Sequence, residues 1–398
     1  MKVVCVGGGP ASLYLSILLK AQDPARDISV FEKNPAGSTY GWGVTYWPAM
    51  LDILMAHDAP SARAIAQHSA RWSDGVAHVR DLVTVHHGDE GFAVGRHELL
   101  RILAERAVDL GVSVHFGRTV APGDPLLDAD LVVAGDGARS ALRDQHAAHF
   151  GTRIAAGRNR FIWLGTTRVF RSFTFAFAET EHGWLWSYAY GFDGEHSTCI
   201  VECAPDTWSG LGLDTMERGE ALRLLEKLLA APLEGHPLIG RTDVAGPAQW
   251  QTFPTVTNRV WSRDNLVLIG DAAHTTHYSI GAGTTLAMQD AMSLAAALRT
   301  PAPLPAALGA YERERKRALL PQQSAARHSA GWYENLPRYV GLAPHQMFAL
   351  LGQRHSPLLP YVPPQLYYRV DRAIERTQAL RSLKRWLGPR IARALQKD

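Results

Sequence analysis

The chain has 398 residues, of which 20% are charged and 46% hydrophobic, and its formal net charge at pH 7 is +3. This composition indicates a globular protein with a large core, and so small a charge gives no reason to expect a nucleic-acid partner. The three cysteines lack metal-ligand spacing, so we expect neither a metal site nor a disulfide framework, and a reducing cytoplasm fits. Glycines break the first apolar run, and no run is long enough to span a membrane, so we expect no signal peptide and no membrane partner.

The first stretch with chemical meaning runs from Val3 to Glu32. An apolar segment leads into Gly7-Gly8-Gly9-Pro10-Ala11-Ser12, an apolar helix pattern follows, and a second β-branched run ends at Glu32 and Lys33. This order is typical of a βαβ unit that binds a dinucleotide. Gly7 permits the tight turn, Gly9 lets backbone approach a pyrophosphate, and Glu32 lies where a carboxylate accepts hydrogen bonds from a ribose. The alternative is an ordinary glycine-rich turn, and Ser12 stands where a third glycine is usual.

The following segments continue an α/β pattern. Glycines alternate with bulky residues from Tyr40 to Val44, as in backbone that passes close to a flat ligand, although a plain loop explains the pattern equally well. Helices are expected over 48–57 and 61–67, and weak strands over 76–96. A well-marked helix opens at Arg96, which is either a fixed charge for phosphates or a solvated surface residue. The strand 131–134 ends in Gly135-Asp136-Gly137, which places a carboxylate at the ligand-binding edge of a parallel sheet.

The pattern changes between Arg160 and Cys203. Aromatic and β-branched residues alternate there with period two, which predicts an antiparallel sheet with one aromatic face. Most of these rings are expected to be core, and a minority could line an aromatic substrate pocket. Residues 250–260 are expected to add another strand to this sheet.

The chain then returns to the first domain. A buried strand over 265–269 is followed by Gly270-Asp271, and Gly281 and Gly283 precede a helix over 284–298. Asp271 can bind a polyol, and the helix N-terminus near Thr284 and Thr285 can stabilise negative charge on a ring carbonyl. The rest is expected to be helical. Its end, 372–397, carries basic residues among leucines, which favours a solvated helix over one on a membrane surface.

The predicted fold is therefore α/β. A Rossmann-like dinucleotide-binding domain comprises residues 1–157 with 262–300, an inserted antiparallel β-sheet forms a substrate domain at 158–261, and 301–398 form a C-terminal helical region. The oligomeric state is not indicated.

Three motifs in this order resemble those of the single-component FAD-dependent aromatic hydroxylases, a family of flavoprotein monooxygenases. They are Gly7-x-Gly9-x-x-Ser12, Asp136-Gly137-x-x-Ser140 with Arg143, and Gly270-Asp271-Ala272-Ala273-His274 with Gly281-x-Gly283. The resemblance covers nearly the whole chain and implies FAD as cofactor, with NADH or NADPH as transient reductant. The residues it implies for FAD are Gly7, Gly9, Pro10, Ala11, Ser12, Glu32, Lys33, Gly43, Val44, Arg96, Asp136, Gly137, Gly270, Asp271, Gly281, Gly283, Thr284 and Thr285. Tyr278 replaces the usual proline and Ala282 the usual glutamine, both beside the flavin ring.

A narrower resemblance concerns the substrate. Several further stretches are similar to the salicylyl-CoA 5-hydroxylase and anthraniloyl-CoA monooxygenase group, and also to indole-hydroxylating enzymes of violacein-type and indole-terpenoid pathways. They are Gly41–Val44, Asn159–Thr166, Glu181–Trp184, Ile200–Cys203 and His277–Gly281. The residues from Trp47 to Met50 differ from the thioester enzymes, which favours an indole-type substrate in natural-product biosynthesis. An aryl-CoA ring hydroxylase is the alternative.

The implied reaction uses O2 and a flavin hydroperoxide to hydroxylate or epoxidise an electron-rich aromatic ring. No side chain is compelled as a base, and the candidates for a catalytic role are His277, Tyr278 and Glu202. A flavin halogenase would need a lysine near the substrate, yet none occurs between Lys33 and Lys227. A non-catalytic flavin-binding protein is the alternative of another class.

Overall fold

The first sheet has six strands and includes the N-terminal βαβ unit. The structure, a computed structural model, describes residues 1–38, 41–241 and 248–375. Neighbouring strands are parallel except for one antiparallel hairpin at the edge. Their order is β15 (Ser262–Arg263), β16 (Leu266–Leu268), β7 (Leu131–Ala134), β1 (Lys2–Val6), β2 (Asp27–Glu32) and β6 (Ser113–Phe116). These strands are nearly continuous apolar runs because parallel sheets are covered on both faces. One core cluster joins them to α1 (Pro10–Gln22), α4 (Arg96–Asp109) and α10 (Gly283–Arg299).

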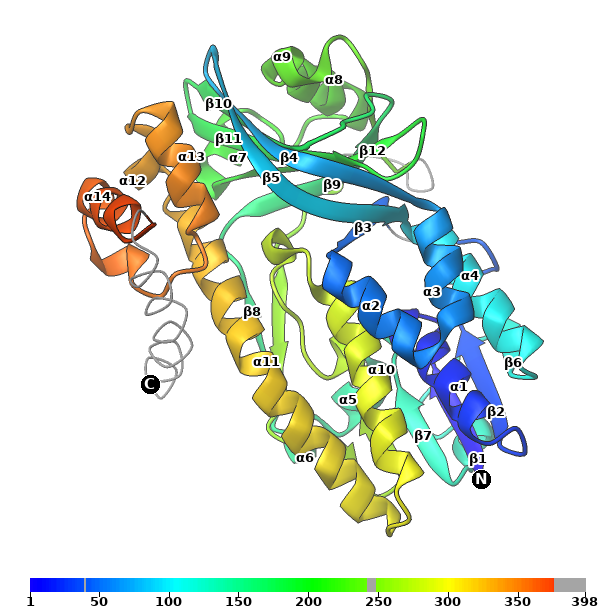
Figure 1. Ribbon diagram of the computed structural model, residues 1–398. Helices are drawn as coiled ribbons and strands as arrows, with labels where there is room; N and C mark the ends of the chain where they lie inside the picture. The colour runs from blue at the N-terminus through cyan, green and yellow to red at the C-terminus, as the bar shows by residue number, and fades with distance from the viewer. Residues whose placement is uncertain (39–40, 242–247, 376–398) are drawn as a thin grey trace.

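The second sheet has eight strands and lies above the first in Figure 1. All its neighbours are antiparallel except β10 and β4, which are parallel. The order is β13 (Leu238–Ile239), β9 (Arg160–Thr166), β12 (Ser197–Cys203), β11 (Gly183–Gly191), β10 (Phe173–Thr180), β4 (Ser69–Val79), β5 (Leu82–Gly95) and β3 (Gly43–Tyr46). The register aligns Phe177, Trp186, Glu202 and Phe161 in one row across four strands. A single carboxylate therefore shares a row with three aromatic rings.

Sheet membership differs from the boundaries expected from the sequence. Strands β3, β4 and β5, between residues 43 and 95, join the eight-stranded sheet. The segment expected to add a strand at 250–260 instead forms β14 (Pro254–Thr257), which pairs with β8 (Arg153–Ala156) in a separate two-stranded sheet. Alternation along a strand reveals its faces but not its partner, and the pairing of β10 with β4 joins segments that are far apart in the chain.

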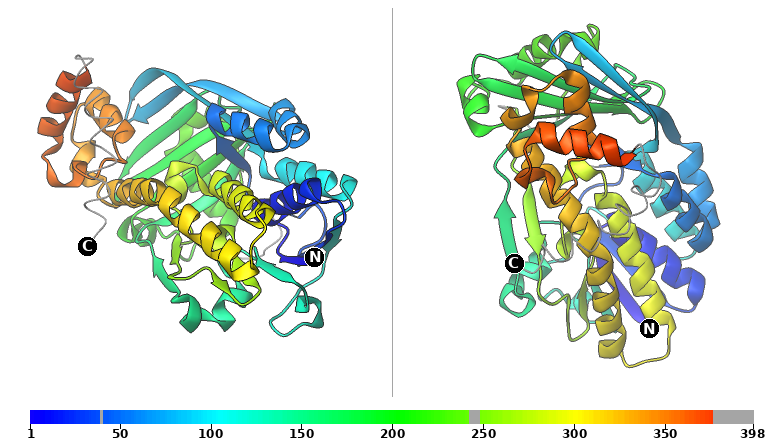
Figure 2. Two further views of the ribbon diagram at one scale, coloured as in Figure 1. Left: turned by 60° about the horizontal axis from the view of Figure 1, so that its bottom comes forward. Right: turned by 60° about the vertical axis from the view of Figure 1, so that its left-hand side comes forward.

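Helices fill the space between and around the sheets. Helix α11 (Leu304–Glu334) runs beside α10 and continues to the aromatic face of the eight-stranded sheet (Figures 1 and 2). There the rings of Tyr333 and Trp186 stack with centroids 5.7 Å apart. The other face of that sheet packs on α8 (Arg218–Leu228) and α9 (Ala230–Leu233). The remaining helices are α2 (Pro48–His57), α3 (Ala59–Gln67), α5 (Ala141–Gln145), α6 (Ala147–Phe150), α7 (Pro205–Gly210), α12 (Pro337–Val340), α13 (Pro344–Gly352) and α14 (Pro364–Glu375). Short 3-10 turns are η1 (Pro125–Leu127), η2 (Gly270–Ala272), η3 (Tyr278–Ile280) and η4 (Leu359–Tyr361).

The predicted α/β fold with a helical C-terminal region is confirmed. The basic residues expected in a terminal helix lie almost entirely beyond residue 375, outside the described residues. Within the described ranges, no helix combines the length and apolar character that crossing a membrane requires.

Candidate FAD and substrate site

The turn after β1 forms an open cradle. Gly7 has a φ of +98°, and a Cβ atom there would lie 2.4 Å from the carbonyl oxygen of Gly135. Space is free around a Cβ built on Gly9, directly before α1 begins at Pro10 and Ala11. Ser12 takes the position of the third glycine and packs against Gly135. A Cβ atom added at Gly135 would lie 2.1 Å from the Ser12 hydroxyl oxygen. The cradle is thus closed by protein on one side and open at Gly9, where a pyrophosphate would meet the helix N-terminus.

Glu32 ends β2 beside this cradle. Its Oε2 accepts a hydrogen bond from the Gly8 amide at 2.8 Å, and its Oε1 accepts from the amide and side chain of Asn34 at 2.9 and 2.6 Å. These bonds fix the carboxylate while leaving it half-buried, so it can still accept from a ribose hydroxyl. The neighbouring Lys33 is exposed.

Three charged residues from separate segments lie around the cradle: Arg96 is near Asp271 and Glu32, and the backbone of Asp136 is beside Gly7. The pKa of Arg96 is lowered by burial, while the nearby carboxylates of Asp271 and Glu32 oppose this. Its Nε and the Oδ1 of Asp136 are buried and have no hydrogen-bond partner among the described residues. Gly137, with a φ of +82°, turns the chain beside Asp136. A guanidinium donor and a carboxylate acceptor are the groups that would pair with the phosphate and ribose of FAD.

A buried ion cluster holds the loop that carries Asp271. Asp290 on α10 accepts hydrogen bonds from the Gly270 amide at 3.0 Å, from His274 at 2.8 Å and from Arg315 on α11 at 2.7 Å. Burial by itself would raise the pKa of Asp290, but the charges and hydrogen bonds of His274 and Arg315 outweigh it and lower the pKa. The sequence analysis did not identify Asp290 or Arg315. The sequence held one signal for them: each is a charged residue at a helix position whose neighbours on the same face are mainly apolar.

Glycines from two segments, 41–43 and 281–283, are expected next to the flavin ring. Gly281 has a φ of +62°, and a Cβ there would lie 2.6 Å from the Thr45 hydroxyl, whereas Gly283 faces open space. At the other segment, a Cβ on Gly43 would lie 2.6 Å from Phe192, and one on Gly41 would lie 2.6 Å from Trp163. The protein's own rings therefore account for the glycines at 41 and 43. Val44 is buried, and Thr284 and Thr285 are half-buried in the first turn of α10.

Tyr278 joins this loop to the aromatic face of the eight-stranded sheet. Its ring lies 4.5 Å from that of Phe161 and 6.2 Å from that of Tyr188. Its hydroxyl donates to Oε2 of Glu202 at 2.5 Å, and Asn159 donates to Oε1 at 2.7 Å. Glu202 is 1% exposed, and burial raises its pKa to about 7. Two of the three predicted catalytic residues thus form a direct pair. The sequence analysis assigned no role to Asn159, which occupies the second oxygen of Glu202.

His277 lies beside Tyr278 but is engaged elsewhere. Its Nδ1 is 2.8 Å from the Ser279 hydroxyl and caps η3. Burial lowers its pKa to about 4, so the imidazole is neutral near pH 7. Arg354 donates to the Ser279 carbonyl and to the hydroxyl of Ser329, both at 3.1 Å, which ties the loop to α11.

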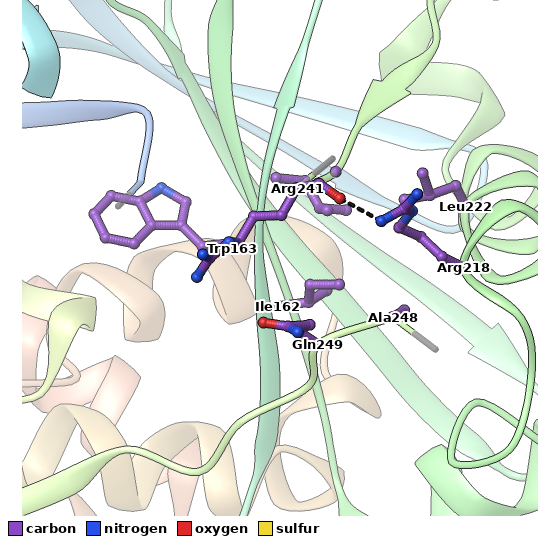
Figure 3. Close-up of a pocket in the computed structure, with 9 residues that line it drawn as sticks. Ile162, Trp163, Arg218, Leu222, Arg241, Ala248 and Gln249 are labelled. Carbon is purple, nitrogen blue, oxygen red and sulfur yellow. Dashed lines mark hydrogen bonds between the residues drawn. The ribbon is translucent and has the colours of Figure 1, made fainter. Parts of the chain in front are cut away.

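A separate pocket lies against the opposite face of β9 (Figure 3). Ile162, Leu222 and Gln249 line it, and Arg218 donates to the backbone carbonyl of Arg241 at 2.7 Å. The indole of Trp163 points away from it (Figure 3), towards the aromatic face that holds Tyr278. This pocket shares no residue with the cradle or with the Tyr278–Glu202 pair. Within the described residues, no cluster of histidine, cysteine and acidic side chains is suited to a metal ion.

The cradle has the open turn at a helix N-terminus that dinucleotide-dependent oxidoreductases use to hold a pyrophosphate. Residues 118–322 match the family described as FAD binding domain. The chain is 38% identical over 349 residues to a salicyloyl-CoA 5-hydroxylase from a Streptomyces species, covering 85% of this chain and 66% of that protein. It is 34% identical to a 3-hydroxy-4-methyl-anthranilyl-[aryl-carrier protein] 5-monooxygenase from Streptosporangium sibiricum, covering 85% of this chain and 90% of that protein.

A third relative is named for a different kind of substrate. The chain is 28% identical to a protodeoxyviolaceinate monooxygenase from Chromobacterium violaceum, covering 94% of this chain and 100% of that protein. The chain therefore belongs to the FAD-dependent aromatic monooxygenases, as the sequence predicted. Enzymes of this family use NAD(P)H as reductant.

Proposed function

We propose that the protein hydroxylates an aromatic ring with NAD(P)H and O2. One oxygen atom enters the ring, the other leaves as water, and NAD(P)H supplies two electrons. The observation that carries the proposal is the Tyr278–Glu202 pair, set among aromatic rings directly before the loop that starts α10. The proposed substrate domain is the eight-stranded sheet, so it includes the strands from 43–95 as well as those within 158–261. The proposed FAD-binding domain is the rest of 1–157 with 262–300.

FAD, when bound, supplies the redox chemistry and the reaction with O2, and the protein binds and orients the reactants. In this proposal Gly7, Gly9 and Glu32 hold the ADP part. Arg96 and Asp136 hold the phosphate and ribose region, and Asp271 holds the ribityl chain. The first turn of α10 would face the flavin ring, where its free N–H groups would stabilise negative charge.

Glu202 and Tyr278 handle a proton in this scheme. Attack on a ring that bears a hydroxyl or amino group is favoured when that group loses its proton. The proton passes to the Tyr278 hydroxyl oxygen while the Tyr278 proton passes to Oε2 of Glu202, along the hydrogen bond already present. A carboxyl group with a pKa of about 7 is poised to accept a proton near neutral pH. His277, neutral and bonded to Ser279, has a positioning role.

For the substrate, we place an aromatic acid carried as a thioester first. The relatives at 38% and 34% identity are both named for aryl groups of this kind. An indole-type ring is the second candidate, favoured by the violacein-pathway relative, whose whole length is matched. The buried aromatic face suits both, because each presents a flat, electron-rich ring.

The test is NAD(P)H oxidation by the FAD-loaded protein, with product and hydrogen peroxide measured together. The two substrate sets are hydroxy- or aminobenzoyl thioesters and indoles. Stimulated oxidation with an oxygenated product and little peroxide supports the proposal, and the productive set decides the substrate class. Tyr278→Phe is the matched variant: it keeps the ring and removes the proton path, so FAD binding should persist while product formation falls. Unstimulated oxidation with both sets would contradict the proposal.

A further inference from the structure

A second cavity lies beside the first turn of α10, apart from the aromatic face. Its walls come from β3, β5, the helices α2, α3 and α4, and the start of α10. They include Val44, Val94, Leu99 and Met288, which are all buried, so core side chains form most of the walls, and the half-buried Thr284 and Thr285 stand at the α10 end. None of its lining residues is shared with the Tyr278–Glu202 pair or with the rings around it.

The lining offers little to water. No lining residue carries a formal charge. The polar end of Tyr46 is turned to Ser69, to which its hydroxyl donates at 2.7 Å, and the Thr45 hydroxyl is directed to the Gly281 carbonyl at 3.5 Å. A cavity with aliphatic walls and few free polar groups stays dry and takes up small apolar molecules. The occupant that fits is therefore small, uncharged and apolar.

The position of the cavity suggests which small molecule that is. Val44, Thr284 and Thr285 line it, and all three are among the residues proposed to hold FAD. The Gly281 loop thus has Tyr278 and the aromatic face at one end and the dry cavity at the other. Of the reactants in the proposed reaction, dioxygen alone is small, uncharged and apolar.

We propose that this cavity is a binding site for dioxygen, from which it reaches the flavin without crossing the aromatic substrate pocket. The inference rests on the proposed function only for the position of the flavin ring. It separates the two co-substrates in space, so that an aromatic substrate can fill its pocket without blocking the supply of oxygen.

Xenon serves as the probe, because it binds dry apolar cavities. In crystals of the FAD-loaded protein under xenon pressure, we expect xenon between Val94, Leu99 and Met288. Leu99→Phe should fill the space and remove the xenon. Val94→Ile adds a single methyl group, and it serves as the second variant if the phenylalanine perturbs folding. Xenon in other cavities but not in this one would overturn the proposal.

A rate measurement provides the second readout. In stopped flow, the second-order rate at which reduced FAD reacts with O2 should fall several-fold in Leu99→Phe, while FAD content and reduction by NAD(P)H stay unchanged. Leu222→Phe is the control, since it fills the pocket on the far face of β9 and should leave both rates unaltered. An unchanged oxygen rate in a correctly filled cavity would refute the proposal. A slowed rate together with xenon binding would support it even if neither substrate set gave product, which would count against the proposed function alone.

Discussion

The raised pKa of Glu202 predicts a specific dependence of stability on pH. The carboxyl group is 1% exposed, and its pKa rises from an ordinary 4.5 to about 7. Because the folded state holds this proton more tightly than the unfolded state does, its contribution to stability is complete below pH 4.5. That contribution is lost as the pH rises through 7. A difference of about 2.5 pKa units corresponds to about 3 kcal/mol.

Glu202→Gln should remove this dependence, because the amide does not titrate. The free energy of unfolding of each apoprotein is measured with urea at pH 4.5 and at pH 7.5. We expect the decrease between these two pH values to be about 3 kcal/mol larger in the unaltered protein than in the variant. Glu179→Gln is the control, since Glu179 is 53% exposed and pairs with Arg80 at the surface. Identical pH profiles for Glu202→Gln and the unaltered protein would refute the assignment of the raised pKa to this residue.

Three further substitutions test the cofactor site. Gly9→Val should leave the circular dichroism spectrum unchanged but abolish FAD binding, because its side chain enters the free space of the cradle; a yellow variant with full FAD content would contradict the cradle. Asp271→Ala should likewise lose FAD on purification, and full flavin stoichiometry would disprove its role. Asp290→Ala leaves buried Arg315 without its carboxylate, so we expect a loss of about 3–5 kcal/mol in unfolding free energy and weaker FAD binding. Urea titration decides this last case, and a loss below about 1 kcal/mol, as for a surface ion pair, would show that the cluster is not structural.

The βαβ unit and its glycine turn could be predicted because their signals are local. Gly7, Gly9 and Glu32 fall within one βαβ unit, and each residue type follows from the backbone geometry or hydrogen bonding needed at that point. The order of the motifs then identified the family. The helix expected at 48–57 is α2, which has the same bounds, Pro48–His57.

The contacts that build the substrate side are not local. The pairing of β10 with β4 depends on partners from distant segments, as does the bond from Tyr278 to Glu202, which spans 76 positions. The bond from Asn159 to Glu202 spans 43. A sequence pattern shows that a residue is polar in an apolar strand, but its partner emerges only when the sheet register is known. Asp290 and Arg315 were missed for the same reason, because each appears in isolation as an ordinary helix residue.

The departure at Tyr278 is best understood together with Glu202. A carboxyl group on the aromatic face of a sheet is costly unless its oxygens are hydrogen-bonded, and the described residues supply Asn159 for one oxygen and Tyr278 for the other. Tyr278 therefore has two consequences at once: it makes the burial of Glu202 tolerable, and it connects that carboxyl group to the loop that begins α10. A proline at this position would leave Oε2 without that donor. The same substitution that departs from the family pattern thus creates a titratable pair among the rings of the proposed substrate pocket.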